Sequence, residues 1–399
     1  MRDPALVQVL GPLAPFAEGF RAWLELVGYA QGSRAVHLRL MAQLSGWLGE
    51  RGLDSSALSP AVMDEFDAHR RDGHQGGRPV RRCRSPLLEY LREVGAAPCV
   101  QRVAGPVETF LVAYGIYLSQ ERGLAAGTVQ RHTDAVRPFL TARVGAAGLD
   151  LTGLAGADIV AFMLAQSVSA APATVQRTGT ALRSLLGFLH VQGVIDSSLV
   201  GAVPAAANWK LAGLVRYLTG EQVAALLASC DQGTSVGRRD LAVLTLLVRL
   251  GLRAGEVAGL RLEDIDWRRG EITVRGKGDR RERLPLPSDV GEVVVAYLNT
   301  SRPGAARGRE VFAGTRAPHR ALTRGAVSQL VARASTRAGL GTIFAHRLRH
   351  TAATAMLQAG GSLDEVGQVL RHRNTLTTAG YAKVDHERLR TVARAWVVA

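Results

Sequence analysis

Cysteine, aromatic residues and long apolar runs are all scarce in this chain of 399 residues. Only Cys83, Cys99 and Cys230 are present, at irregular spacing, which argues against a disulfide framework or a zinc cluster. No apolar run is long enough to predict a transmembrane helix, and the N-terminus lacks the basic start and cleavage site of a signal peptide. The sequence therefore predicts a folded cytoplasmic protein with no membrane partner.

Acidic residues and lysine are also in short supply. The chain has 49 Lys and Arg residues against 34 Asp and Glu residues, and arginine supplies most of the positive charge. The formal net charge is +15 and the sequence pI is about 10.8. Such an excess of arginine suits bidentate contacts with phosphate and predicts a nucleic-acid partner. A coding bias toward arginine and alanine is the alternative explanation.

Apolar residues recur at helical spacing through most of the chain, and one stretch is repeated. The repeated positions, at a constant offset of 95, are Gly28, Ala30, Gly32, Ser33 and His37 with Gly123, Ala125, Gly127, Thr128 and His132. We interpret them as two copies of a small helical domain, each of which starts its second helix at an N-cap, Ser33 or Thr128. The predicted organisation is an N-terminal copy (1–104), a second copy (105–203), a linker (204–217) and a C-terminal domain (218–399).

The C-terminal domain contains the one clear β region. Thr219 and Gln222 form a predicted capping box at its first helix. Residues 270–287 alternate apolar and polar positions around a Gly-Lys-Gly-Asp turn, which predicts a β-hairpin with a basic tip. The remainder reads as helices, so the expected fold class is mainly α with a small antiparallel β region.

Four places in this domain carry chemically active side chains. They are "LGLRAGEVAGL" with Arg253 and Glu256, the hairpin with Lys277, "HRLRH" with His346 and Arg349, and "LRHRNTLTTAGYAKV" with His372 and Tyr381. Taken singly, each has an ordinary explanation, such as a surface ion pair or a solvated lysine. A zinc helix is a poor reading of His346 and His350, because Arg347 stands where the HExxH motif needs glutamate.

Taken together, these residues predict phosphoryl transfer on a phosphodiester. Guanidinium and imidazole donors stabilise the charge that develops on phosphate oxygens, and loss of one such donor typically costs about 3–4 kcal/mol of transition-state stabilisation. A tyrosine hydroxyl can form a covalent phosphoester. A lysine on a hairpin can protonate the leaving oxygen as a general acid.

Residues 218–399 resemble the catalytic domain of the tyrosine recombinases, the phage integrase family. "GLRAGEVAGL" is similar to the first arginine box, "VRGKGDRRERLPLP" to the lysine hairpin, "HRLRH" to the H-x-x-R box, and "TTAGYAKV" to the nucleophile box. The intervals also agree, with Arg349 three residues after His346 and Tyr381 nine residues after His372. Arg371 is a departure, because the family usually has glycine before the second histidine.

The resemblance implies a role for each catalytic residue. Tyr381 attacks the scissile phosphate, which gives a 3′-phosphotyrosyl link and a free 5′-hydroxyl. Arg253 and Arg349 hold the non-bridging oxygens, and Lys277 protonates the leaving oxygen. His346 and His372 support the phosphate and the proton transfers, and Glu256 orients the neighbouring side chains. No cofactor, ATP or metal is expected.

The resemblance also implies the partners. The second copy resembles the SAM-like core-binding domain, and with the catalytic domain it should form a C-shaped clamp on double-stranded DNA core sites. Candidate DNA contacts are Arg131, Arg177, Arg183, Arg280 and Arg371. A DNA-assembled tetramer is expected, with the tail helix at 385–399 docked in trans or in cis. A directionality factor or a second recombinase is a further candidate partner.

The resulting hypothesis is a recombinase of a bacterial mobile element, an integrase or a transposase, associated with the nucleoid. Two alternatives are retained. A type IB topoisomerase shares the chemistry, and strand exchange between two labelled duplexes distinguishes it. A non-catalytic DNA-binding protein on the same fold would not need the complete set of catalytic residues.

The N-terminal copy generates the first testable prediction. We expect it to contact DNA that flanks the core site, or a neighbouring protomer, because it repeats a DNA-binding domain. Deletion of residues 1–100 should then shorten the footprint on the core site or weaken assembly. An unchanged footprint together with unchanged assembly would refute this role.

Overall fold

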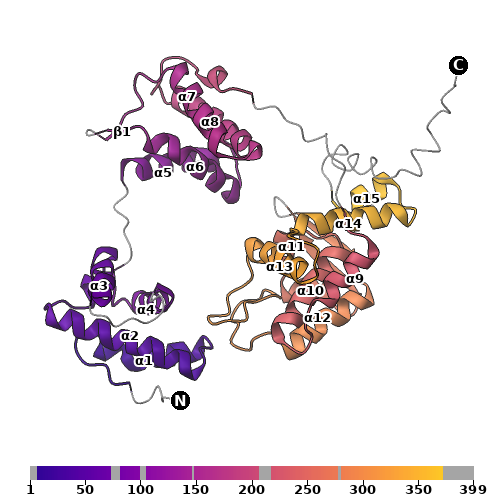
Figure 1. The fold of residues 1–399 in the computed structure, drawn as a ribbon, viewed down its shortest axis with the longest axis horizontal. Coiled ribbons are helices and arrows are strands. Elements are labelled where there is room, and N and C mark those ends of the chain that lie inside the picture. The colour runs from indigo at the N-terminus through magenta and orange to yellow at the C-terminus, as the bar shows by residue number, and fades with distance from the viewer. Residues whose placement is uncertain are drawn as a thin grey trace. The chain divides into compact units, whose positions relative to one another are not determined.

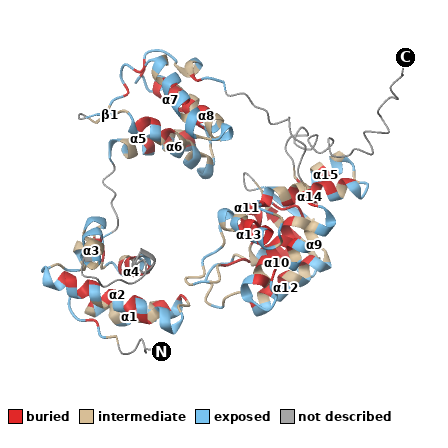
Figure 2. Ribbon diagram, viewed as in Figure 1, coloured by how far each residue is buried: buried red, intermediate tan, exposed pale blue. Residues whose placement is uncertain are grey.

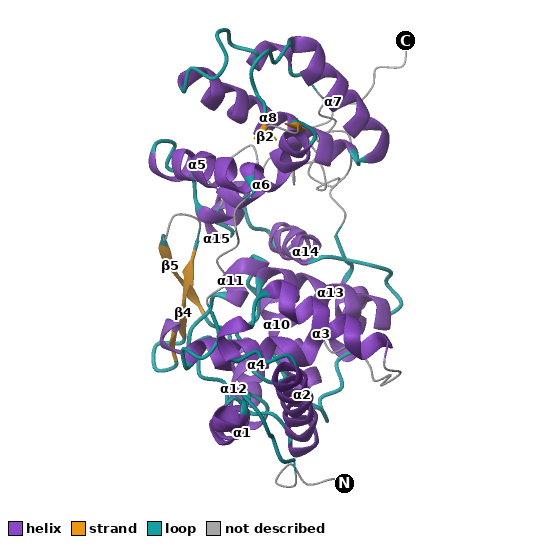
Figure 3. Cartoon of the chain, turned by 90° about the vertical axis from the view of Figure 1, so that its left-hand side faces the viewer, coloured by secondary structure: helices purple, strands orange, loops and turns teal. Residues whose placement is uncertain are grey.

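The computed structural model describes residues 7–72, 81–98, 105–145, 148–205, 217–276 and 280–371 (Figure 1). These residues are mostly helical and contain two small antiparallel sheets, as Figure 3 shows, so the predicted fold class is confirmed. Contacts divide the chain into two compact units, residues 1–99 with 213–399 and residues 100–212. None of the helices within the described ranges is long and apolar enough to cross a membrane.

The N-terminal segment folds around a core of its own. Its helices are α1 (Ala17–Leu26), α2 (Gln31–Glu50), α3 (Pro60–Asp72) and α4 (Arg81–Glu93). Phe20, Leu38, Met41 and Leu91 are buried between them, and the burial is confined to the inward faces of the helices (Figure 2). Helix α2 is buried over most of its circumference, because the other helices of the segment pack around it.

The unit of residues 100–212 has a similar set of helices. They are α5 (Pro106–Gln120), α6 (Ala126–Thr141), α7 (Gly156–Ser169) and α8 (Pro172–Val191). Between α6 and α7 lies a two-stranded sheet, β1 (Val144–Gly145) with β2 (Gly148–Leu149). Its core includes Tyr114, Phe139, Ile159 and Leu185.

The second helix of each segment begins earlier than predicted. Its N-cap is Ala30 in one segment and Ala125 in the other, so Ser33 and Thr128 lie three residues inside the helix and the predicted caps are wrong. The reason is a left-handed glycine just upstream, Gly28 with φ 86° and Gly123 with φ 59°. The chain turns at this glycine, and the next helix starts at the third residue after it.

The helices of residues 217–371 pack around α10 (Ser235–Arg249). Those in contact with it are α9 (Gly220–Ala228), α11 (Ala254–Ala258), α12 (Ser288–Thr300), α13 (Arg324–Arg337) and α14 (Ala345–Gln358). Val243, Leu246 and Leu247 of α10 are fully buried. The predicted capping box of α9 is confirmed, because Thr219 Oγ1 accepts from the backbone N–H of Gln222 at 3.2 Å and Gln222 Oε1 accepts from that of Thr219 at 3.1 Å.

The predicted hairpin is present. Strand β4 (Glu271–Arg275) pairs with β5 (Arg281–Pro285) in antiparallel register, with Val274 opposite Glu282. Strand β3 (Ile265–Asp266), which was not predicted, pairs with the other edge of β4. After α14, the helix α15 (Leu363–Val369) packs back on it through a small apolar cluster that includes Leu357, Val366 and Leu370.

The separate cores generate a stability prediction. Phe139 is 2% exposed, and its ring centroid lies 5.1 Å from that of Phe162 on α7. We expect Phe139→Ala to lower the free energy of unfolding of the unit of residues 100–212 by about 3–5 kcal/mol, because it leaves a cavity. Calorimetry of the full chain should show one transition shifted and the transition of residues 217–371 unchanged.

Val168→Ala is the matched control. Val168 is 91% exposed on α7 of the same unit, so its truncation should change the free energy of unfolding by less than about 0.5 kcal/mol. A single transition that shifts as a whole in Phe139→Ala would show that the two units unfold as one.

Candidate active site

A tight turn at Gly251 positions Arg253. Gly251 has a φ of 59°, in the left-handed region. A Cβ on Gly251 would lie 2.5 Å from Leu370 Cδ2 and 3.3 Å from Ala352 Cβ, so this turn packs directly on α14 and on the end of α15. Arg253 follows as the N-cap residue of α11, with 43% of its side chain exposed.

Glu256 is a buried carboxylate with three N–H donors around it. Its side chain is 4% exposed. Oε1 accepts from Arg253 Nη1 at 2.6 Å, while Oε2 accepts from the backbone N–H of Arg253 at 2.8 Å and from Arg371 Nη2 at 2.7 Å. The predicted contact with Arg253 is therefore present, and Glu256 both caps α11 and fixes the guanidinium of its neighbour.

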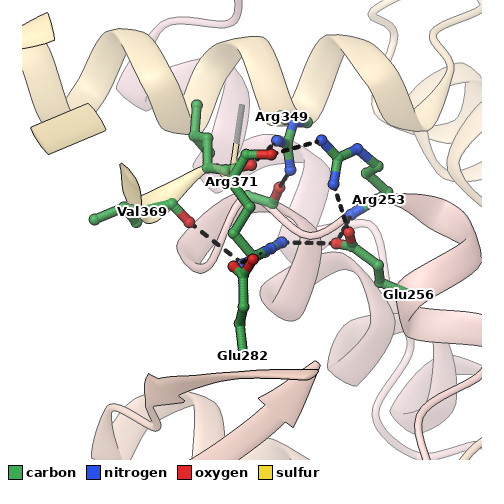
Figure 4. A network of polar contacts seen from close by, with 8 residues as sticks. Arg253, Glu256, Glu282, Arg349, Val369 and Arg371 are labelled. Carbon is green, nitrogen blue, oxygen red and sulfur yellow. Dashed lines mark hydrogen bonds and ion pairs between the residues drawn. The ribbon is translucent and has the colours of Figure 1, made fainter. Parts of the chain in front are cut away.

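Arg349 is one of the most deeply buried charged residues in the described ranges, at 2% exposure. Nη1 donates to the Gly251 carbonyl at 2.6 Å, and Nη2 donates to the Leu370 carbonyl. The neighbouring guanidinium of Arg253 donates to the Arg371 carbonyl at 3.3 Å. Both predicted arginines thus meet at the turn of residues 370–371, which comes directly before His372 (Figure 4).

His346 lies one helical turn before Arg349 on α14. Partial burial lowers the pKa of its imidazole, and the positive charges of Arg349, Arg253 and Arg324 lower it further. The imidazole is therefore mostly neutral at pH 7, when one ring nitrogen donates and the other accepts. His350 stacks edge-on against it, with ring centroids 4.2 Å apart.

Part of the predicted site falls outside the described ranges. Lys277, His372 and Tyr381 lie there, and so does the predicted tail helix at 385–399. Arg280, beside the hairpin tip, is described and exposed. The structure brings together Arg253, Glu256 and Arg349, and His346 is coupled to them electrostatically.

The predicted DNA contacts outside the catalytic domain divide into two kinds. Arg131 and Arg177 are exposed, and each donates at 2.8 Å to a threonine hydroxyl three residues earlier. Arg183 differs, because it donates to the carbonyls of Val203 at 3.0 Å and Pro204 at 3.1 Å. Its guanidinium therefore helps to hold the end of the domain in place, and its contact with DNA stays a prediction.

Arg371, another candidate DNA contact, has a side chain that is 4% exposed and is paired with Glu256 within the protein. Two further charged residues near the site were not predicted. Glu282 on β5 lies 3.8 Å from Arg371 Nε, and Arg324 at the start of α13 acts on His346. Glu282 lies within the lysine hairpin box but had no predicted role there, whereas Arg324 lies outside every box, and the fold brings both near the site.

Comparisons with known proteins bear on this geometry. The model of the phage integrase family matches residues 216–388. Integrase/recombinase y4rA of Sinorhizobium fredii is 37% identical over 97% of this chain and 95% of its own length. The chain belongs to the phage integrase family of tyrosine recombinases. Tyrosine recombinase XerD of Listeria monocytogenes is 32% identical over 69% of this chain and 94% of its own length.

Solved structures share the fold of this tyrosine recombinase. XerH site-specific recombinase, bound to a palindromic difH substrate, matches with a TM-score of 0.56 and 18% identity over 74% of this chain and 98% of that one. A lambda integrase dimer, bound to a COC′ core site, matches with a TM-score of 0.54 and 18% identity over 73% and 98%. At this identity the likeness concerns the fold alone.

The lowered pKa of His346 generates a prediction of pH-dependent stability. In the unfolded recombinase a histidine takes up a proton near its ordinary pKa of about 6.5, whereas folded His346 resists protonation. Folding is therefore disfavoured as the pH falls from about 8 through 6.5 toward the lower folded pKa. We expect His346→Asn to lose less stability than wild type over this range, measured by denaturant titration at each pH.

His132 provides the matched control. Burial and the charges of Arg131 and Arg122 lower its pKa in the unit of residues 100–212. His132→Asn should flatten the pH dependence of that unit and leave the catalytic unit unchanged. Identical pH profiles for His346→Asn and wild type would contradict the assignment.

Proposed function

We propose that this tyrosine recombinase is a site-specific recombinase of a mobile element that cuts and rejoins DNA strands through a 3′-phosphotyrosine intermediate. One observation carries the proposal. Arg253 and Arg349, from segments far apart in sequence, meet at the turn of residues 370–371, immediately before His372. Two guanidinium groups fixed at one point suit the non-bridging oxygens of a single phosphodiester.

The proposed cleavage step is a transesterification. The Tyr381 oxygen forms a bond to phosphorus and gives its proton to a histidine of the site, and the bond from phosphorus to the 5′-oxygen breaks. Lys277 gives a proton to that oxygen, which leaves as a hydroxyl. The neutral imidazole of His346 can donate to a phosphate oxygen or relay a proton, and we assign the second histidine role to His372.

Strand joining is the same step in reverse. The 5′-hydroxyl of a partner strand attacks the phosphotyrosine, and the tyrosine leaves with its proton restored. One phosphoester is exchanged for another at each stage, so the bond energy is conserved and no nucleotide triphosphate is consumed. Burial of Arg349 and Glu256 keeps the donors fixed before DNA arrives, which lowers the reorganisation needed in the transition state.

Duplex DNA is the proposed substrate, and self-assembly on DNA is the proposed working state. The formal charge of +15 and the exposed Arg131, Arg177 and Arg280 support contact with the phosphate backbone. Solved proteins of this fold are bound to core sites, and one is a lambda integrase tetramer bound to a Holliday junction. We propose residues 105–203 as the core-binding domain and residues 1–104 as its duplicate.

Recombination is favoured over DNA relaxation by the extent of the similarity. The match to integrase/recombinase y4rA spans both helical segments as well as the catalytic domain. A need for accessory proteins and docking of the tail in trans remain predictions.

Covalent capture tests the nucleophile. A pool of nicked duplexes with randomised cores would be incubated with the protein, and the trapped DNA would be sequenced to recover a core site. We expect wild type to form a protein–DNA band on a denaturing gel and Tyr381→Phe to form none, because the phenylalanine ring lacks the attacking oxygen.

Tyr117→Phe is the matched control, since it removes one hydroxyl from a half-buried position outside the catalytic domain. It should retain the band. A band that persists in Tyr381→Phe would assign the nucleophile to another tyrosine.

A further inference from the structure

Arg371 stands in a backbone conformation that does not favour arginine. Its φ is 57°, in the left-handed region where glycine is the usual residue at the end of a helix. A side chain in this region is unfavourable for the backbone. Its presence at the end of α15 therefore calls for a compensating contact of the side chain.

The side chain makes that contact with Glu256. Arg371 Nη2 donates to Glu256 Oε2 at 2.7 Å, and both side chains are 4% exposed (Figure 4). A second carboxylate, Glu282, lies 3.8 Å from Nε but is 44% exposed. Distance and solvent screening both make the pairing with Glu256 the stronger one. Nη1 donates to the Val369 carbonyl at 3.3 Å.

The same turn holds both arginines of the proposed phosphate site. The Arg371 carbonyl accepts from Arg253, and the Leu370 carbonyl accepts from Arg349. Glu256 in turn accepts from both Arg253 and Arg371. Arg371 is thus linked to Arg253 in two ways. Its carbonyl contacts Arg253 directly, and its side chain contacts Glu256, which in turn contacts Arg253.

We propose that Arg371 is a positioning residue for strand cleavage, which acts through Glu256 on the guanidinium of Arg253. The proposal rests on the function proposed above, because it takes Arg253 as a phosphate-binding residue. Without the Arg371 side chain, Glu256 would have Arg253 as its only guanidinium partner among the described residues. The carboxylate could then draw that guanidinium away from the phosphate.

Single-turnover cleavage of the captured core site tests this role. The variants are Arg371→Met, which removes the charge at similar length, Arg371→Gly, which also frees the backbone, and Arg371→Lys, which keeps the charge. We expect Met and Gly to lower the rate constant at saturating DNA by about tenfold to 100-fold, as misplacement of a reacting group does. Lysine should restore part of the rate, and DNA affinity should stay within about twofold because the residue is buried.

Two further comparisons identify the route of the effect. Arg371→Met should add little in a Glu256→Gln background, because residues that act as one unit are not additive. Glu282→Gln should cleave at nearly the wild-type rate. A 5′-bridging phosphorothiolate, whose sulfur leaves without protonation, should restore Lys277→Ala but not Arg371→Met.

Several results would overturn the proposal. They are a wild-type rate in Arg371→Gly, a loss confined to DNA affinity, full additivity with Glu256→Gln, and rescue of Arg371→Met by the phosphorothiolate. All rates would be measured below the melting temperature of every variant. Absence of a Tyr381-dependent adduct in wild type would overturn the proposed function and this proposal together, whereas the four results above leave the proposed function intact.

Discussion

The burial of the Arg349 guanidinium is the constraint on which the rest of the site depends. A charge that is 2% exposed is unstable in a protein interior unless its N–H groups are satisfied. Two of its acceptors are the backbone carbonyls of Gly251 and Leu370, so the path of the backbone provides acceptors for its N–H groups. The loop before α11 and the end of α15 must therefore both lie against α14, and those are the segments that carry Arg253 and lead into His372.

Small residues make this close approach possible. Gly251 lies where a Cβ would meet Leu370 and Ala352, and α14 presents Ala352 and Ala353 on its buried face. Leu370 in turn belongs to the apolar cluster that fixes α15 on α14. Apolar packing thus places the carbonyls, and the carbonyls orient the guanidinium. A larger side chain at position 251 would meet Leu370 and Ala352, and it would push apart the segments that hold the two arginines.

Motif and spacing predicted the catalytic domain well, whereas side-chain direction was predicted poorly. The hairpin, the capping box of α9 and the contact between Arg253 and Glu256 follow from local patterns, so they could be found in the sequence. The partners of Arg183 and Arg371 within the protein could not, because they are set by later chain segments or by a left-handed turn. The caps at Ser33 and Thr128 failed for a related reason, since an upstream glycine decides where the helix starts.

Arg371 also affects the charge of the site, because it pairs with Glu256. Arg253, Arg349 and Arg371 contribute three positive charges, Glu256 contributes one negative charge, and the lowered pKa leaves His346 mostly neutral at pH 7. A phosphodiester brings one negative charge, and the pentavalent transition state concentrates more on its equatorial oxygens. Glycine at position 371 would let Glu256 cancel one of the two remaining arginines. With arginine there, the carboxylate is neutralised from the protein side, and the charges of Arg253 and Arg349 remain available where negative charge develops.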